Sequence, residues 1–247
     1  FTAAWDGDPR QLFWRLCEQS PAPFAVYVED GQGTAVASSS PEEFLWRSGD
    51  VVRTRPIKGT RPRGGDAAAD AALLHELVHS EKDQAELAMI VDLLRNDLGK
   101  VAVTGSVAVG PFPEHASFAQ VHHLYATVSA RVPSALSHAE LLRATFPGGS
   151  ITGCPKLRCM EILESLELGR RGVYTGAIGT FGPGADLHLN IAIRTLVHRG
   201  GRVRANAGGG VTALSDPRRE WEETLHKLAG IERALQCRVA VPGEAAP

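Results

Sequence analysis

The sequence is short of cysteine, methionine and aromatic residues, and this shortage limits the chemistry that it can carry. Its 247 residues include only 4 cysteines and 2 methionines, and aromatic residues make up 6% of the chain. No two cysteines have the Cys-x-x-Cys spacing that is typical of zinc or thiol redox sites, and four cysteines are too few for a disulfide scaffold. We therefore expect a reduced, cytoplasmic protein.

The sequence also lacks a charge imbalance, a long apolar run and a signal peptide. The formal net charge is −2 at pH 7, whereas nucleic-acid-binding domains usually carry a clear positive excess. No apolar run reaches the roughly 20 residues that cross a bilayer. The first ten residues, FTAAWDGDPR, contain neither a basic nor an apolar signal region. We expect neither nucleic acid nor a membrane among its partners.

Strand-like and helix-like segments alternate irregularly along the chain. Helices are predicted where polar caps precede apolar residues at helical spacing, and the clearest cover 81–101, 154–167 and 215–236. Strands are predicted at 24–30, 33–40, 50–57 and 122–132, and a meander of three strands over 172–211. This order favours an α+β fold with large antiparallel sheets over a parallel doubly wound one. No linker divides the chain, so we expect a single domain over residues 1–247 with a frayed tail at 238–247.

The last predicted helix carries two acids and a base on one stripe. Glu220, Glu223 and Lys227 follow each other at i, i+3 and i+7. Two carboxylates at this spacing can share a hard cation through oxygen ligands. A surface pair beside the positive end of the helix is the alternative interpretation.

Three further polar residues occur in apolar surroundings. Glu86 shares a helix face with apolar residues, so it needs either a metal or an ion-pair partner such as Lys82 or Arg95. Arg194 interrupts an apolar strand, where its planar guanidinium suits either a ligand carboxylate or an internal acid. A lone histidine such as His123 is more often a hydrogen-bonded core residue than a functional one.

Two glycine-rich segments and one basic segment complete the set of candidates. FPGGSITGCPKLR at 146–158 precedes a helix, so its free backbone N–H groups suit an anion, although a tight turn would look the same. NAGGGV at 206–211 lets a ligand approach the backbone closely, although it could mark a bulge. RTRPIKGTRPRG at 53–64 places Lys58 among four arginines on what we expect to be a turn.

Nine motifs in this chain, in the same order, identify it as similar to the chorismate-utilising enzymes. They cover residues 38–232 and read SPEEF, PIKGTRPRG, KDQAELAMIVDLLRNDLG, HHL, FPGGSITGCPK, YTGAIG, IAIRT, AGGGV and EWEETLHK. The family includes the first components of anthranilate synthase and aminodeoxychorismate synthase, and the isochorismate and salicylate synthases. The resemblance implies one α+β domain with two large antiparallel sheets packed together and helices outside. It also leads us to expect a further N-terminal half, not present in this sequence, that completes the sheets.

The resemblance assigns roles to individual residues. Glu42 would be the general acid, His123 would lie near the substrate ring, and Lys58 would be the nucleophile. The implied magnesium ligands are Glu86, Glu220 and Glu223. The implied substrate-binding groups are Thr152, Tyr174, Arg194, Lys227 and the backbone of Gly208, Gly209 and Gly210.

Lys58 selects the branch of the family. Anthranilate synthases usually have alanine here, in PIAGT, whereas aminodeoxychorismate synthases typically have lysine, in PIKGT. The resemblance then implies Mg²⁺-dependent amination of chorismate at C4 through a Lys58 adduct at C2, which leads to p-aminobenzoate. The addition requires a neutral amine, which nearby positive charge and burial both favour.

Ammonia would come from a partner glutamine amidotransferase, because this chain holds no such domain. The alternatives are an anthranilate synthase component I, another chorismate-utilising reaction, and a remnant that binds chorismate without turning it over.

Overall fold

The computed structural model describes residues 1–213 and 215–238, so the predicted tail at 238–247 lies outside the described residues except for Arg238. Contacts divide the chain into two units. The first unit consists of Phe1–Pro41, Arg171–Ile178 and Ala192–Pro247, and the second of Glu42–Arg170 and Gly179–Ile191. The single domain expected over residues 1–247 stays a prediction.

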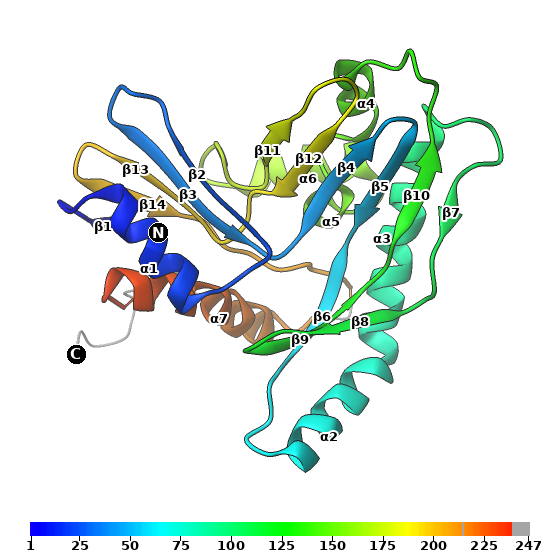
Figure 1. Ribbon diagram of the computed structural model, residues 1–247. Coiled ribbons are helices and arrows are strands. Elements are labelled where there is room, and N and C mark those ends of the chain that lie inside the picture. The colour runs from blue at the N-terminus through cyan, green and yellow to red at the C-terminus, as the bar shows by residue number, and fades with distance from the viewer. Residues whose placement is uncertain (214, 239–247) are drawn as a thin grey trace. The chain divides into compact units, whose positions relative to one another are not determined.

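The first unit contains a five-stranded antiparallel sheet and two helices (Figure 1). In spatial order the strands are β1 (Thr2–Ala4), β14 (Arg202–Ala205), β13 (Thr195–Arg199), β3 (Thr34–Ser40) and β2 (Phe24–Glu29). The helices are α1 (Pro9–Gln19), capped by Asp8, and α7 (Pro217–Leu235), capped by Asp216. Both helices begin with proline, whose fixed φ and missing N–H suit the first helical position.

The core of the first unit forms where these helices meet the sheet. Leu12 and Leu16 of α1 are almost fully buried together with Leu228 of α7 and Leu196 and Val203 of the sheet. Burying each leucine completely stabilises the fold by roughly 1.5–3 kcal/mol relative to exposure. This packing fixes α7, which carries three of the predicted site residues.

The second unit contains a six-stranded sheet and a three-stranded sheet. The order in the larger sheet is β11 (Ala177–Phe181), β12 (Leu187–Ile191), β4 (Glu43–Ser48), β5 (Val51–Arg55), β10 (Val128–Arg131) and β7 (Ala108–Val109). The order in the smaller sheet is β6 (Ile57–Pro62), β9 (Val121–Tyr125) and β8 (Glu114–Ser117). The helices are α2 (Ala67–Val78), α3 (Glu81–Gly99), α4 (His138–Thr145), α5 (Gly149–Thr152) and α6 (Lys156–Leu166).

The predicted α+β class with antiparallel sheets is confirmed, but three segments end differently from the prediction. The strand expected at 50–57 is confirmed as β5, but the turn expected in the 53–64 stretch is a second strand, β6, which belongs to a different sheet and is separated from β5 by Pro56. The expected strand at 122–132 divides in the same way into β9 and β10, and Ala126 N–H donates to the Pro56 carbonyl at 3.3 Å. Since apolar residues alternate across each break, the sequence pattern did not reveal the change of sheet.

The third difference lies in the predicted meander over 172–211. The stretch expected as one long strand at 185–199 is β12 in the second unit and β13 in the first. Arg194 lies in the break between them with a φ of +48°. A positive φ is unfavourable for a residue with a Cβ atom, so the strand ends here.

Helix α3 supplies much of the core of the second unit. Ser80 caps its first turn by accepting from Asp83 N–H at 3.3 Å. The predicted apolar stripe is confirmed, because Leu87, Ile90, Val91, Leu94 and Leu98 are all buried. The other face of the helix is left for polar contacts.

Candidate functional site

The four arginines of the 53–64 stretch all have partners in the second unit. Arg53 binds both carboxylate oxygens of Glu43, at 2.9 and 3.2 Å, and lies over the Trp46 ring. The remaining contacts are Arg55 with Thr127, Arg61 with Glu76 and Asp83, and Arg63 with Asp70. Carboxylates therefore compensate three of the four positive charges. The expected field of free arginine charge around Lys58 is largely neutralised.

Lys58 differs from these arginines. Its side chain is half-buried on β6, and its backbone pairs with Leu124 of β9. Within the described part of the chain, no hydrogen bond or ion pair engages its amino group. An amine without a carboxylate partner is available to react.

Glu42 and Glu43 are neighbours with different surroundings. Both are buried, at 6% and 2% exposure. The Glu43 carboxylate binds Arg53 and accepts from His188 Nε2 at 3.1 Å, so both of its oxygens are engaged by neighbouring side chains. Glu42, which directly precedes β4, remains the candidate acid of the pair.

His123 is buried on β9 and bonded to β6. Its Nδ1 lies 2.9 Å from Thr60 Oγ1, and its ring meets the edge of Phe118 with centroids 5.8 Å apart. His123 thus has the hydrogen bond expected of a core histidine. Its partner, Thr60, lies two residues after Lys58 on β6. Its proximity to a substrate ring stays a prediction.

Asp70 of α2 connects this helix to the end of the basic stretch. It accepts from Arg63 at 2.7 and 2.8 Å, from Gly64 N–H at 2.8 Å and from the buried His122 at 3.0 Å. The Arg63 guanidinium, followed by the Gly64 amide, holds the pKa of the Asp70 carboxyl well below its usual range. The ionised form of Asp70 therefore stabilises the folded state.

This shift predicts an acid-dependent loss of stability. The pKa of Asp70 is lower in the folded protein than in the unfolded protein, where it is about 3.9. The Asp70 carboxylate therefore stabilises the fold fully above the unfolded pKa, and this stabilisation is lost as the pH falls towards the folded pKa. We expect the free energy of unfolding of wild type to exceed that of Asp70→Asn by a constant amount from pH 5 to 7, and the difference to shrink below pH 4. Urea unfolding across this pH range measures it. A difference that is independent of pH would contradict the assignment.

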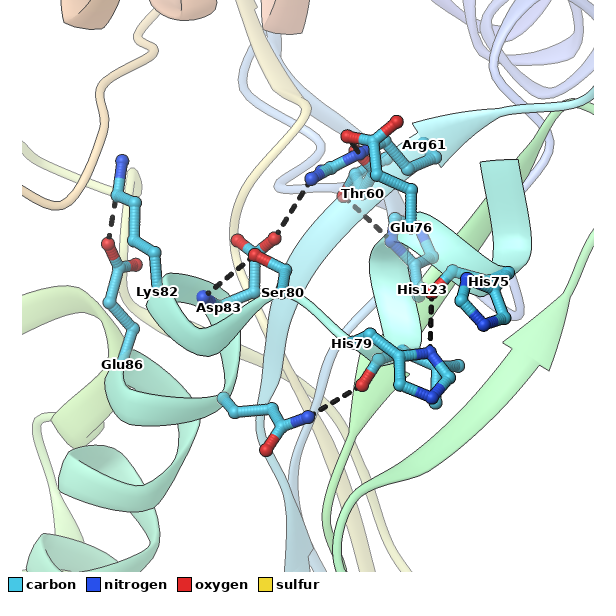
Figure 2. Close-up of polar contacts among 12 residues, drawn as sticks. Thr60, Arg61, His75, Glu76, His79, Ser80, Lys82, Asp83, Glu86 and His123 are labelled. Atoms are coloured by element: carbon cyan, nitrogen blue, oxygen red, sulfur yellow. Dashed lines mark hydrogen bonds and ion pairs between the residues drawn. The ribbon is translucent and has the colours of Figure 1, made fainter. Parts of the chain in front are cut away.

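Glu86 lies on α3 one turn after Asp83, on the same helix face as the buried Ile90 and Leu93, as predicted. Its side chain is 19% exposed and lies 3.8 Å from Lys82 Nζ (Figure 2). The structure thus contains the ion pair with Lys82 that was one of the two interpretations. The distance is long for a hydrogen-bonded pair, so the carboxylate can exchange this partner for another cation.

Thr152 ends the short helix α5 in the glycine-rich 146–158 segment. It is 9% exposed, and its Oγ1 donates to the Gly148 carbonyl at 3.0 Å. The hydroxyl oxygen retains its capacity to accept a hydrogen bond. The predicted turn and the helix after it are both present, and anion binding there stays a prediction.

Asp97 and Lys156 form a buried ion pair to which we had given no role. Asp97 is 1% exposed on α3, and it accepts from Lys156 at the start of α6 and from Lys100 at 2.8 Å. Lys156 also donates to the Thr145 carbonyl at 3.0 Å. The pair fixes the segment that carries Thr152. The position of Asp97 beside the apolar stripe of α3 was the signal that could have revealed it.

The glycines that follow β14 lie against the first turns of α7 in the first unit. A Cβ atom on Gly209 would lie 3.0 Å from Glu220 Oε2 and 3.9 Å from Glu223 Oε1. Lys227 Nζ donates to the Gly208 carbonyl at 3.0 Å and pairs with Glu223 at 2.7 Å. The predicted stripe on α7 and the glycine backbone thus form one cluster, in which a side chain on Gly209 would crowd Glu220.

Tyr174 and Arg194 belong to the same unit as this cluster. A Cβ atom on Gly208 would lie 3.3 Å from the Tyr174 hydroxyl. Thr175 N–H donates to the Ala192 carbonyl at 2.8 Å, which holds the tyrosine segment beside the break that contains Arg194.

The Arg194 guanidinium has no acidic partner among the described residues. Burial alone lowers the pKa of this guanidinium. The internal pairing that we considered as the alternative is therefore not found. A partly buried cation without an anion is costly, so the predicted role of Arg194 in binding an anionic ligand stays open.

A cavity of about 310 Å³ opens in the first unit beside Tyr174 and Thr195. Its lining includes Arg171, Arg199, Arg202 and Arg204. Such a positive lining suits an anion.

No described group of three or more His, Cys, Asp and Glu side chains is arranged to hold a metal ion. Glu220 and Glu223 lie together in the first unit and Glu86 belongs to the second, so the joint magnesium assignment stays a prediction. The four cysteines are free thiols. Over residues 1–213 and 215–238, no helix has the length and apolar character of a membrane span.

A family model described as chorismate binding enzyme matches residues 1–233. The chain is 49% identical over 244 residues to the aminodeoxychorismate synthase of Streptomyces griseus, an alignment that covers 98% of this chain and 33% of the relative. It is 44% identical over 235 residues to an anthranilate synthase component 1 of Haloarcula marismortui, an alignment that covers 94% of this chain and 48% of the relative. Overall identity therefore does not separate the two activities.

Solved structures share the fold. Anthranilate synthase component I from Streptococcus pneumoniae TIGR4 aligns with a TM-score of 0.83 at 34% identity, over 95% of this chain and 51% of that one. The anthranilate synthase component I-like fold is confirmed. The chain spans between about a quarter and about half of the length of the curated relatives it matches.

Proposed function

Because this chain belongs to the chorismate-binding enzyme family, we propose that it aminates chorismate at C4 to give 4-amino-4-deoxychorismate, the precursor of p-aminobenzoate. The observation that carries the choice of branch is Lys58. Its amino group alone among the cations of the 53–64 stretch has no partner within the described residues. A lysine held in this way suits covalent catalysis.

The proposed reaction has two steps. The neutral Lys58 amine forms a bond to C2 of chorismate, both ring double bonds shift by one position towards C4, and the C4–O bond breaks. Glu42 donates the proton with which the hydroxyl leaves as water, so an ammonium adduct and a carboxylate result. Ammonia then forms the C4–N bond, the C2–N bond breaks, and Lys58 leaves as a neutral amine. The proton that the new C4 ammonium loses restores Glu42.

The first unit would bind the substrate carboxylates. Arg194 has no acidic partner within residues 1–213 and 215–238, and a guanidinium binds a carboxylate through two parallel hydrogen bonds. Tyr174, Lys227 and the exposed backbone of Gly208–Gly210 would add donors. Chorismate carries two carboxylates, which matches this excess of positive groups.

Glu86, Glu220 and Glu223 are the residues that would hold magnesium. Their carboxylate oxygens are ligands that Mg²⁺ accepts. Glu220 and Glu223 already lie beside the same glycine backbone, and Lys227 supplies a positive charge to Glu223 in the structure. When bound, the ion would neutralise a substrate carboxylate and assist the departure of the C4 hydroxyl.

A second component would supply the ammonia. Several relatives are named component 1, and a glutamine amidotransferase is the class of enzyme that releases ammonia for such a reaction. Anthranilate formation is the second candidate function, because a relative of that name is 44% identical. A protein that binds chorismate without turnover is the third.

Product identity tests the proposal. We expect the protein, supplied with chorismate, Mg²⁺ and ¹⁵N-labelled ammonium, to form a product that keeps the enolpyruvyl group and carries nitrogen on C4, as read by mass spectrometry and NMR. Fluorescent anthranilate as the product would refute the branch. Folded protein that binds chorismate but forms neither product would favour the non-catalytic alternative.

A further inference from the structure

We propose that Asp83, in the first turn of α3, is a positioning residue that sets the direction of the Lys58 side chain. It does so through Gly59, the extra residue of a bulge in β6, and through Arg61, which follows the bulge. This inference rests on the proposed role of Lys58.

The bulge decides where Lys58 points. Lys58 pairs with Leu124 and Thr60 pairs with His123, so two residues of β6 are spanned by one step of β9, and Gly59 is the extra residue. In a regular strand, Lys58 and Thr60 would point to the same face. A bulge breaks this alternation and re-aims the flanking side chains. The direction of the Lys58 amine therefore depends on the geometry of Gly59.

Asp83 and Leu77 pack directly on Gly59. Its φ is +76°, a conformation that glycine adopts without strain. A Cβ atom at this position would lie 3.0 Å from Cβ and Cγ of Asp83 and 2.9 Å from Cδ1 of Leu77. Leu77 is fully buried. The bulge is thus pressed against α2 and α3 with no room for a side chain.

Arg61 ties the other side of the bulge to the same carboxylate. Its Nη2 donates to Asp83 Oδ2 at 3.2 Å, its Nε to Glu76 Oε1 at 2.8 Å and its Nη1 to the Thr60 carbonyl at 3.0 Å (Figure 2). The Asp83 side chain is 15% exposed, whereas that of Glu76 is 62% exposed. Solvent screens the pair with Glu76 more strongly. The Asp83 carboxylate is therefore the partner of Arg61 that holds β6 in place.

Asp83 also connects Lys58 to the turn that carries Glu86. Its backbone N–H is capped by Ser80, so its place at the start of α3 is fixed. Glu86 follows three residues later, on the same side of the helix. Asp83 thus joins the strand of the proposed nucleophile to the helix of a proposed metal ligand.

A matched pair of variants tests this inference. Asp83→Asn removes the charge of the less exposed carboxylate that binds Arg61. Glu76→Gln makes the same change in the more exposed carboxylate that binds Arg61. We expect Asp83→Asn to lower kcat for aminodeoxychorismate formation by about 10- to 100-fold, since small displacements of a reacting group have effects of this size. KM for chorismate should stay within about twofold. Glu76→Gln should change kcat by less than about twofold.

Hydrogen exchange supplies a readout that does not depend on activity. Amides of β6 should exchange faster in Asp83→Asn than in Glu76→Gln, whereas amides of β13 should not differ. Asp83→Glu should recover part of kcat, because it restores the charge. Equal kcat in wild type and Asp83→Asn, or equal losses in both variants, would overturn the inference.

The outcomes separate the two proposals. If wild type forms no aminodeoxychorismate, the proposed function fails, and exchange at β6 still decides whether Asp83 holds the strand. If wild type is active and Asp83→Asn matches it in kcat and in β6 exchange, only the positioning role fails.

Discussion

Replacing Lys58 by alanine is expected to lower the rate of aminodeoxychorismate formation by about 1,000-fold or more, the size of effect seen when a covalent nucleophile is removed. The reason is that ammonia would have to displace the C4 hydroxyl directly, without an adduct that divides the step in two. Chorismate should still bind with a dissociation constant within a few-fold of wild type, because the amine is not among the proposed carboxylate-binding groups. Steady-state kinetics and calorimetric titration measure the two quantities.

Lys58→Arg is the matched control for charge. Arginine keeps a long positive side chain on β6, but it stays protonated and cannot add to C2. We expect it to be as inactive as Lys58→Ala. If Lys58→Arg retained most of the activity, the lysine would act as a positive charge and not as a nucleophile. Unchanged activity in Lys58→Ala would remove the residue from the mechanism.

Replacing Arg194 by methionine is expected to raise KM for chorismate by about 100-fold and at the same time to stabilise the folded protein. Truncating a charge that binds a buried anionic group costs about 2–5 kcal/mol of binding. Removing a partly buried charge that has no acidic partner among the described residues has the opposite effect on folding, because its desolvation is no longer required, so we expect the free energy of unfolding to rise. Methionine matches the length of the arginine stem and fills the same space.

Binding of chorismate must weaken while the fold becomes more stable, so KM and the free energy of unfolding must both rise. Urea unfolding reports the free energy of unfolding, and initial rates report KM. The control is Arg53→Met, since Arg53 binds both oxygens of the buried Glu43. Breaking that pair leaves a carboxylate without its partner, so we expect a loss of stability of about 3–5 kcal/mol. A loss of stability in Arg194→Met would show that the guanidinium has a structural partner and would refute its assignment to the substrate.

Local pattern was sufficient for the helices and for the cluster on α7. Caps at Ser80 and Asp216 and apolar residues at helical spacing act within one or two turns, so the sequence contains them in full. The stripe of Glu220, Glu223 and Lys227 follows from helical spacing alone, and the structure places it beside the glycine backbone. The apolar stripe of α3 was predictable for the same reason.

Sheet membership was not predictable from the sequence. The 53–64 stretch was expected as a turn, but β5 and β6 belong to two sheets, and the 185–199 stretch is divided between two units. Alternation shows which residues share a face of a strand, but it contains no information on which strand lies next to it. Pairing between segments distant in sequence decides that.

The sequence by itself determined the residue types, their order and the helical faces that carry the acids, because these depend only on chain chemistry and spacing. It also contained Lys58, on which the proposed choice of branch rests. Only the tertiary structure decided which charges are compensated. Ion pairs of Arg53, Arg61 and Arg63 join residues 7 to 22 positions apart, and these distances close only when strands and helices pack. Among the described residues, the same packing left Lys58 and Arg194 without an acidic partner, since a carboxylate neutralises a cation only where the fold brings the two together.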